Sequence, residues 1–111
     1  MSGVADPVAA RGRTTITSRA LNRLATAVAS DAARVPSREV GLGLTDAQGA
    51  LRVVLTVPVA IRPGDAATLP ERAEELRGAM IAGLRDLAGR SVGTVDIRYA
   101  GVRRTTERRT A

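Results

Sequence analysis

The side chains that most often carry catalysis are missing from this chain. Its 111 residues include no histidine and no cysteine, and all 17 basic residues are arginines, so lysine is absent as well. A serine or threonine nucleophile needs a histidine or an equivalent base beside it, and here neither histidine nor lysine can serve. We therefore expect a protein that is not an enzyme and that acts by binding other molecules.

The acidic residues offer little to a metal or a cofactor. Soft ligands are absent, and most carboxylates are scattered along the chain. Glu71, Glu74 and Glu75 could give oxygens to a hard cation, but acidic residues gather at a helix start because they complement the helix dipole. Paired-carboxylate hydrolysis needs an apolar pocket that raises one pKa, and the sequence around these residues offers none. We expect no metal, no cofactor and no small-molecule substrate.

Two glycine-bearing segments lack the context of a phosphate loop. Gly41-Leu42-Gly43 lies in an expected strand instead of between a strand and a helix. Arg62-Pro63-Gly64-Asp65 precedes an expected helix but lacks the loop spacing. The net charge of +6 still favours anionic partners. A KH-like nucleic-acid-binding module is therefore the alternative interpretation, although no GXXG loop stands between helices and Tyr99 is the one aromatic residue available for stacking.

Apolar periodicity predicts the first elements that would position a binding surface. Residues 1–12 show no periodicity and are expected to be a flexible lead-in, and 13–17 could form a short strand. A helix is expected over 19–34, with Ser18 as its N-cap and with Val35-Pro36 ending it. Its apolar stripe consists of Leu21, Leu24, Ala25, Val28 and Ala32.

A β-hairpin is expected next. Residues 38–45 alternate in hydrophobicity, 46–49 (DAQG) read as a turn, and 51–61 form a long strand whose odd-numbered residues share one face. Pro58 cannot donate to a ladder, so a bulge, a bend or an edge position is expected there. We expect this strand to outgrow its partner, and its exposed edge could accept another strand.

A second helix and a last strand complete the expected domain. Thr68 and Glu71 have the spacing of a capping box before a helix over 69–88, which Gly89 ends. The helix stripe is Leu76, Met80, Leu84 and Leu87, and the strand over 92–102 places Val95, Ile97 and Tyr99 on one face. The order (β)-α-β-β-α-β predicts a two-layer α+β domain over 13–103, with two helices on one face of a small mixed sheet of three to four strands. Residues 104–111 are expected to be a basic flexible tail.

Several of these segments together match a known pattern. They are 13–18 (RTTITS) before the first helix, the glycine-bearing hairpin, Leu87-Ala88-Gly89, and 92–102 (VGTVDIRYAGV). Over 12–103 the chain resembles the alkaline shock protein family, the envelope stress response proteins of Gram-positive bacteria. The resemblance implies a non-enzymatic cytoplasmic protein that assembles with itself and gathers peripherally at the inner face of the cell membrane. There it would bind a small membrane-anchor protein and serve cell-envelope homeostasis.

Two surfaces remain free for binding in this scheme. The sheet face opposite the helices is small, mostly uncharged and flat, and such a face suits a partner or a second copy of the chain. We expect it to carry Val54, Thr56, Pro58, Ala60, Thr94, Asp96 and Arg98. The basic tail could contact an anionic partner such as a membrane leaflet, or it could be a solvated terminus. Its candidate contacts are Arg103, Arg104, Arg108 and Arg109.

Overall fold

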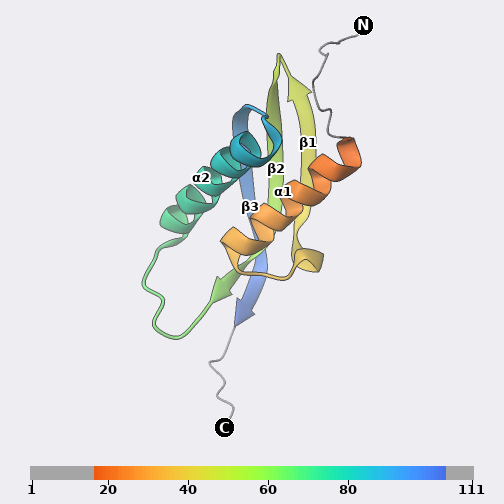
Figure 1. Ribbon diagram of the computed structural model, residues 1–111. Helices are drawn as coiled ribbons and strands as arrows, with labels where there is room; N and C mark the ends of the chain where they lie inside the picture. Colours follow the sequence, from red (N-terminus) through yellow and green to blue (C-terminus); the bar gives the residue numbers. More distant parts are fainter. Residues whose placement is uncertain (1–16, 105–111) are drawn as a thin grey trace, which may run out of the picture.

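The chain folds into two layers, with both helices on one face of a three-stranded sheet (Figure 1). The computed structural model describes residues 17–104. Its elements are α1 (Ser18–Ala33), the 3-10 helix η1 (Ser37–Glu39), β1 (Gly41–Ala47), β2 (Ala50–Ile61), α2 (Leu69–Ala88) and β3 (Val92–Arg104). Strand β1 pairs antiparallel with β2, and β3 pairs parallel with β2 on its other side. The predicted two-layer α+β fold is confirmed.

Helix α1 begins one residue earlier than predicted. The side chain of Thr17 accepts a hydrogen bond from the Ala20 N–H at 3.1 Å, so Thr17 is the N-cap and Ser18 is the first helical residue. The choice of Ser18 was wrong because both hydroxyls can cap and only the local geometry selects one. Of the strand expected over 13–17, residues 13–16 lie outside the described residues, and Thr17 belongs to the helix cap.

The strand expected over 38–45 is shorter at its start and longer at its end. Residues 37–39 form a 3-10 turn, in which the Val40 N–H donates to the Ser37 carbonyl. Strand β1 then extends to Ala47, and only Gln48 and Gly49 turn the chain, with φ values of 55° and 87°. Asp46 therefore lies opposite Leu51 in the ladder and not in the turn. Two-residue turns with positive φ match the twist of a hairpin, which favours the longer strands.

Strand β2 is the centre of the sheet, so the predicted free edge along 51–61 is wrong. Residues Ala50–Thr56 pair with β1 on one side, and β3 covers the other side along nearly the whole strand. Only residues 57–61 run past the end of β1, which confirms that this strand outgrows its hairpin partner. The edges of the sheet are β1 and β3. A central β2 follows from its apolar content, because a strand between two others buries more of its surface.

The irregularity expected at Pro58 is present as a shift in the β2–β3 register. Val57 pairs with Tyr99, but Val59 pairs with Val102, so β3 carries one extra residue at this point. Gly101, whose φ is 87°, lies within the extra stretch. Before the bulge, the odd-numbered residues of β2 are buried; after it, Ala60 is buried and Val59 is only half-buried. The bulge therefore reverses which residues face the helices.

Helix α2 has the predicted bounds and caps. The Glu71 N–H donates to the Thr68 hydroxyl and the Thr68 N–H donates to a Glu71 carboxylate oxygen, which completes the capping box. Gly89 ends the helix with a positive φ. Leu87, predicted on the apolar stripe, is 61% exposed, so the buried part of that stripe consists of Leu76, Met80 and Leu84.

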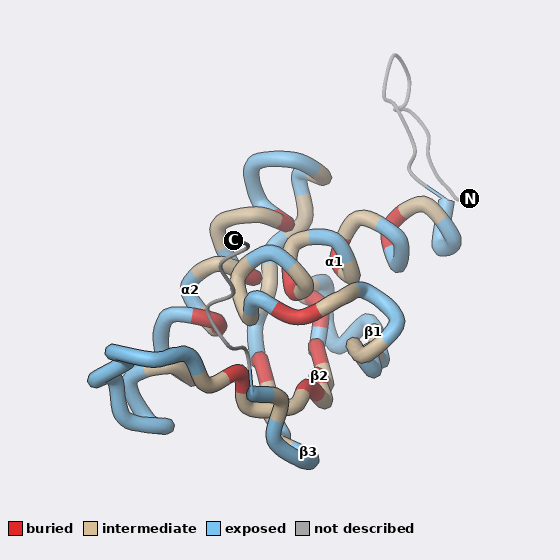
Figure 2. The backbone as a smooth tube through the Cα atoms, turned by 90° about the horizontal axis from the view of Figure 1, so that it is seen from below, coloured by how far each residue is buried: buried red, intermediate tan, exposed pale blue. Residues whose placement is uncertain are grey.

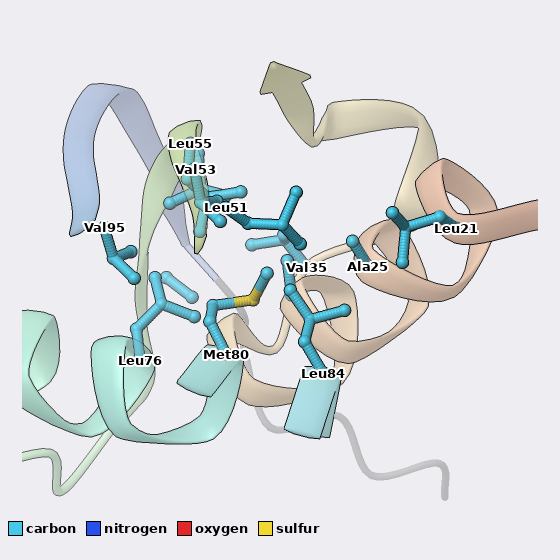
Figure 3. Packing of buried hydrophobic residues seen from close by; sticks show 13 residues of the cluster. Leu21, Ala25, Val35, Leu51, Val53, Leu55, Leu76, Met80, Leu84 and Val95 are labelled. Carbon is cyan, nitrogen blue, oxygen red and sulfur yellow. The ribbon is translucent and has the colours of Figure 1, made fainter. Parts of the chain in front are cut away.

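The core lies between the helices and the helix-facing side of the sheet. The side chains of Leu76, Met80 and Leu84 on α2 are directed toward those of β2 (Figure 3). In the end-on view, the buried segments lie where helices and strands face each other (Figure 2). The buried residues are Leu21, Ala25, Ala29, Val35, Leu51, Val53, Leu55, Val57, Ala60, Leu76, Met80, Leu84 and Val95. No polar side chain of the described residues is buried with them.

Candidate interaction surfaces

The sheet face opposite the helices is uncovered by any element of the described fold (Figure 1). We call it the open face, and the strand register defines its rows. Gly43, Val54 and Asp96 form one row, and Gly41, Thr56 and Arg98 form the next. A third row consists of Thr45, Arg52 and Thr94. The glycines of β1 give this face no side chains at two positions, so its surface is low and flat there.

Five of the seven residues predicted on the open face lie on it, and two do not. Val54, Thr56, Thr94, Asp96 and Arg98 occupy the three rows of the open face. Pro58 and Ala60 line a cavity together with residues of α1 and α2, so they lie on the helix side. Strict alternation along β2 predicted them on the open face, and the bulge at Pro58 breaks that alternation.

Beyond the bulge, the open face carries other apolar side chains in the places predicted for Pro58 and Ala60. Val59 pairs with Val102 and Ile61 pairs with Arg104, and both pairs alternate with the buried Ala60. Val102 is 59% exposed. The open face therefore has an apolar end where β2 and β3 finish. This end lies beyond β1, because residues 57–61 of β2 run past the end of that strand.

Charges of both signs stand on the open face. The Arg98 guanidinium lies 3.0 Å from the Asp96 carboxylate, and the Arg98 side chain is well exposed. Arg52 is exposed in the neighbouring row. Since exposed ion pairs contribute at most about 1 kcal/mol to stability, these charges add little to the stability of the fold.

The helix side of the bulge encloses a cavity of about 110 Å³. Its polar centre is Asp65, whose carboxylate accepts hydrogen bonds from the Arg72 guanidinium at 2.8 Å and from the Arg62 backbone N–H at 3.0 Å. Arg72 also donates to the Ala60 carbonyl at 2.8 Å. Because Arg72 donates both to Asp65 and to the Ala60 carbonyl, this cluster ties the loop after β2 to α2.

This cluster shifts two titrations. The hydrogen bond from Arg72, and then that from the Arg62 backbone, lowers the pKa of Asp65 below its ordinary 3.8. Tyr99 lines the same cavity, and burial of its ring raises the pKa of the phenol above 10.0, against a smaller opposing effect of the nearby arginines. Neither group is thereby prepared for acid–base chemistry near neutral pH.

A second hollow, of about 430 Å³ and open to solvent, lies near the end of the molecule where β2 and β3 finish. Three arginines from distant parts of the sequence line it: Arg34 at the end of α1, Arg62 after β2 and Arg103 near the end of β3. Figure 1 shows the strand ends gathered there. We call this feature the arginine hollow. Its other lining residues are Ser30, Asp31, Val35 and Pro36.

The arginines predicted to lie in a basic tail divide into two groups. Arg103 and Arg104 belong to β3, because the strand runs two residues past the predicted Val102. Arg103 turns to the helix side, where its guanidinium contacts the Glu39 carboxylate at 2.7 Å. Arg108 and Arg109 lie outside the described residues. Arg103 lies within the predicted domain bound of 103, whereas Arg104, expected at the start of the flexible tail, is instead the last residue of β3 and pairs with Ile61.

Sequence reasoning did not single out Arg34 or Arg62. Arg34 was expected as one more exposed residue of the first helix, yet it ends α1 with φ 63° and ψ 41°, in the left-handed region. The helix stop at Val35-Pro36 was a usable signal, since the residue that ends a helix often adopts that conformation. Nothing in the spacing of 34, 62 and 103 indicates that they meet.

Residues 17–104 hold no arrangement typical of a metal centre, a membrane span or a KH-like loop. No three acidic side chains of that range lie close enough together to hold a metal ion. Neither α1 nor α2 combines the length and the apolar content needed to cross a bilayer. The two helices are separated by β1 and β2, so no loop of this range joins them directly as the KH-like alternative needs.

Comparison with known proteins identifies no relative. No family model, no curated protein and no solved structure matches this chain.

Proposed function

We propose that this chain is a non-enzymatic protein that works by assembly, with the open face as its self-association surface. The observation that carries the proposal is the uncovered sheet face with its apolar end at Val59, Ile61 and Val102. Single exposed apolar residues are common on soluble proteins, but contiguous ones mark contact surfaces. Here Val102 is 59% exposed, and the half-buried Val54, Val59 and Ile61 of the neighbouring strand lie on the same face.

A second copy of the same chain suits this surface. A two-fold dimer pairs the same patch on both subunits, so the patch must be complementary to itself. The open face carries Asp96 together with Arg52 and Arg98, so opposite charges can meet across a two-fold axis. Its low relief over Gly41 and Gly43 lets another flat sheet approach closely.

The wider biological role is proposed from the resemblance to the alkaline shock protein family. In that role the assembled protein serves the response to cell-envelope stress, and a small membrane-anchored protein gathers it at the inner face of the membrane. The supporting observations are the domain order, the glycine-bearing hairpin and the run 92–102, which lies in β3. They are features of packing and carry no catalytic step.

Self-association is tested by light scattering after size-exclusion chromatography over a range of protein concentrations. The wild-type protein is expected to form dimers or larger assemblies, and Val102→Glu is expected to shift it toward monomer. Leu87→Glu is the matched control, since Leu87 is as exposed as Val102 but lies on α2. A monomer at every concentration, or an assembly that Leu87→Glu disrupts and Val102→Glu does not, would contradict the proposal.

Docking is tested by fractionating native cells with and without the membrane-anchor protein. The wild-type chain is expected in the membrane fraction only when the anchor is present. A chain that stays in the soluble fraction in both strains would contradict this part of the proposal. The nucleic-acid alternative predicts instead a binding to nucleic acid that falls steeply with salt, as counterions are released.

A further inference from the structure

We infer that the arginine hollow binds the phosphate group of an anionic phospholipid, so that this end of the molecule lies directly on a membrane surface. This inference goes beyond the proposed self-association, because the hollow is on the helix side of the strand ends and not on the open face. It also adds a contact that needs no membrane-anchored protein.

The charge around the hollow favours an oxyanion. Arg34, Arg62 and Arg103 line it, against the single carboxylate of Asp31. Arg103 is also held by Glu39, but Arg34 reaches its partner Asp65 only at 3.8 Å, beyond hydrogen-bonding distance. Guanidinium groups present forked donors that match the oxygens of a phosphate. At least two guanidiniums are thus available to a ligand.

The backbone of Arg34 is a second observation that points to the same place. A residue other than glycine, asparagine or aspartate is rarely found in the left-handed region, because its side chain crowds the backbone there. Glycine is the residue that most often ends a helix in this conformation. Arg34 therefore makes the end of α1 less stable than a glycine would, and Arg34 and Arg62 are both among the residues that line the hollow. Strain of this kind is found where a side chain is needed for binding.

The shape of this end fits a membrane better than a nucleic acid. The arginines form one cluster, with the carboxylates of Asp31 and Glu39 beside it, and so they offer no continuous track for successive phosphates. No aromatic residue lines the hollow for bases to stack on.

The inference is tested by sedimenting the purified full-length protein with vesicles. Vesicles of equimolar phosphatidylglycerol and phosphatidylcholine are expected to bind it at low salt, and vesicles of phosphatidylcholine alone are not. Binding should weaken as salt screens the charges. Failure here would leave self-association untouched, since the light-scattering experiment contains no lipid.

Variants locate the contact. Arg34→Gly and Arg62→Gln are each expected to weaken vesicle binding about five-fold. Arg34→Gly should also melt at the same or a higher temperature than the wild type, which separates loss of binding from loss of folding. Glu39→Gln is expected to strengthen binding, because it releases the guanidinium of Arg103. Arg19→Gln, at the other end of α1, is the control with the same loss of charge and should bind as the wild type does.

Three results would overturn the inference. The first is that the protein does not bind the anionic vesicles at low salt. The second is that Arg19→Gln weakens binding as much as Arg62→Gln, which would show a response to net charge alone. The third is that duplex DNA or inorganic phosphate binds the hollow more tightly than the vesicles do, with the same dependence on Arg34 and Arg62.

Discussion

Gly83 of α2 lies directly against Val28 of α1 where the two helices meet. A β-carbon placed on Gly83 would stand 2.9 Å from the Val28 Cγ1 atom, much closer than the optimal separation of two carbon atoms. The glycine therefore sets how near the helices approach.

Replacing Gly83 tests this contact. Gly83→Ala is expected to lower the free energy of unfolding by about 1–3 kcal/mol, because the added methyl group overpacks the helix interface. This loss of stability should appear even though alanine has a higher helix propensity than glycine. Urea denaturation followed by circular dichroism measures it.

Gly78 is the matched control in the same helix. No atom lies within 4 Å of a β-carbon built there. Gly78→Ala is therefore expected to raise the free energy of unfolding by about 0.5–1 kcal/mol, through helix propensity alone. Adding Val28→Ala to Gly83→Ala should recover part of the loss as a coupling between the two sites. Equal effects of the two glycine substitutions would contradict a tight contact at Gly83.

The hairpin turn gives a second prediction. Gln48 has a φ of 55°, which asparagine adopts more readily than glutamine and which β-branched residues resist. Gln48→Asn is expected to raise the free energy of unfolding by up to about 0.5 kcal/mol, and Gln48→Val is expected to lower it by about 1 kcal/mol or more. Thermal melting compares the three proteins. A valine variant as stable as the wild type would show that the turn has another conformation.

The free energy of unfolding at acidic pH should depend on the protonation of Asp65. Its pKa is lower in the folded protein than in the unfolded chain, chiefly because Arg72 donates to the carboxylate. The stability that this carboxylate contributes is therefore complete above about pH 4 and is lost as the pH falls through the folded value. We expect Asp65→Asn to be less stable than the wild type at pH 7 and the difference to vanish in acid. A difference that is constant with pH would contradict the assignment.

The free energy of unfolding at alkaline pH should depend on the ionisation of Tyr99. It is the one tyrosine of the chain, so the ultraviolet absorbance of phenolate titrates a single group. Burial raises its pKa above 10.0 in the folded state. The corresponding stability is complete below about pH 10 and is lost as the pH rises through the folded value. The absorbance midpoint should lie higher in native protein than in denaturant, and equal midpoints would place the ring in solvent.

The elements with local signals were predictable from the sequence. Residues at each end of helix α2 predict its bounds, because the Thr68–Glu71 capping box begins the helix and Gly89 ends it. Strand β2 is apolar at every second position up to Val57, which determines its buried face before the bulge. Each of these features depends on interactions within one or two turns of chain, and such interactions are visible in a single sequence.

The interaction surfaces needed the tertiary structure. Alternation placed Pro58 and Ala60 on the open face, but a register shift between β2 and β3 moved both to the helix side. That shift depends on how two strands separated by a whole helix are aligned.

By itself the sequence determined which residues can form each helix and strand, that these form two layers, and that histidine, cysteine and lysine are absent. Only the tertiary structure decided that β2 is the central strand and that Arg34, Arg62 and Arg103 share one hollow. The physical reason is that helices and turns are set by neighbours along the chain. A shared surface depends instead on register and packing between segments that are distant in the sequence.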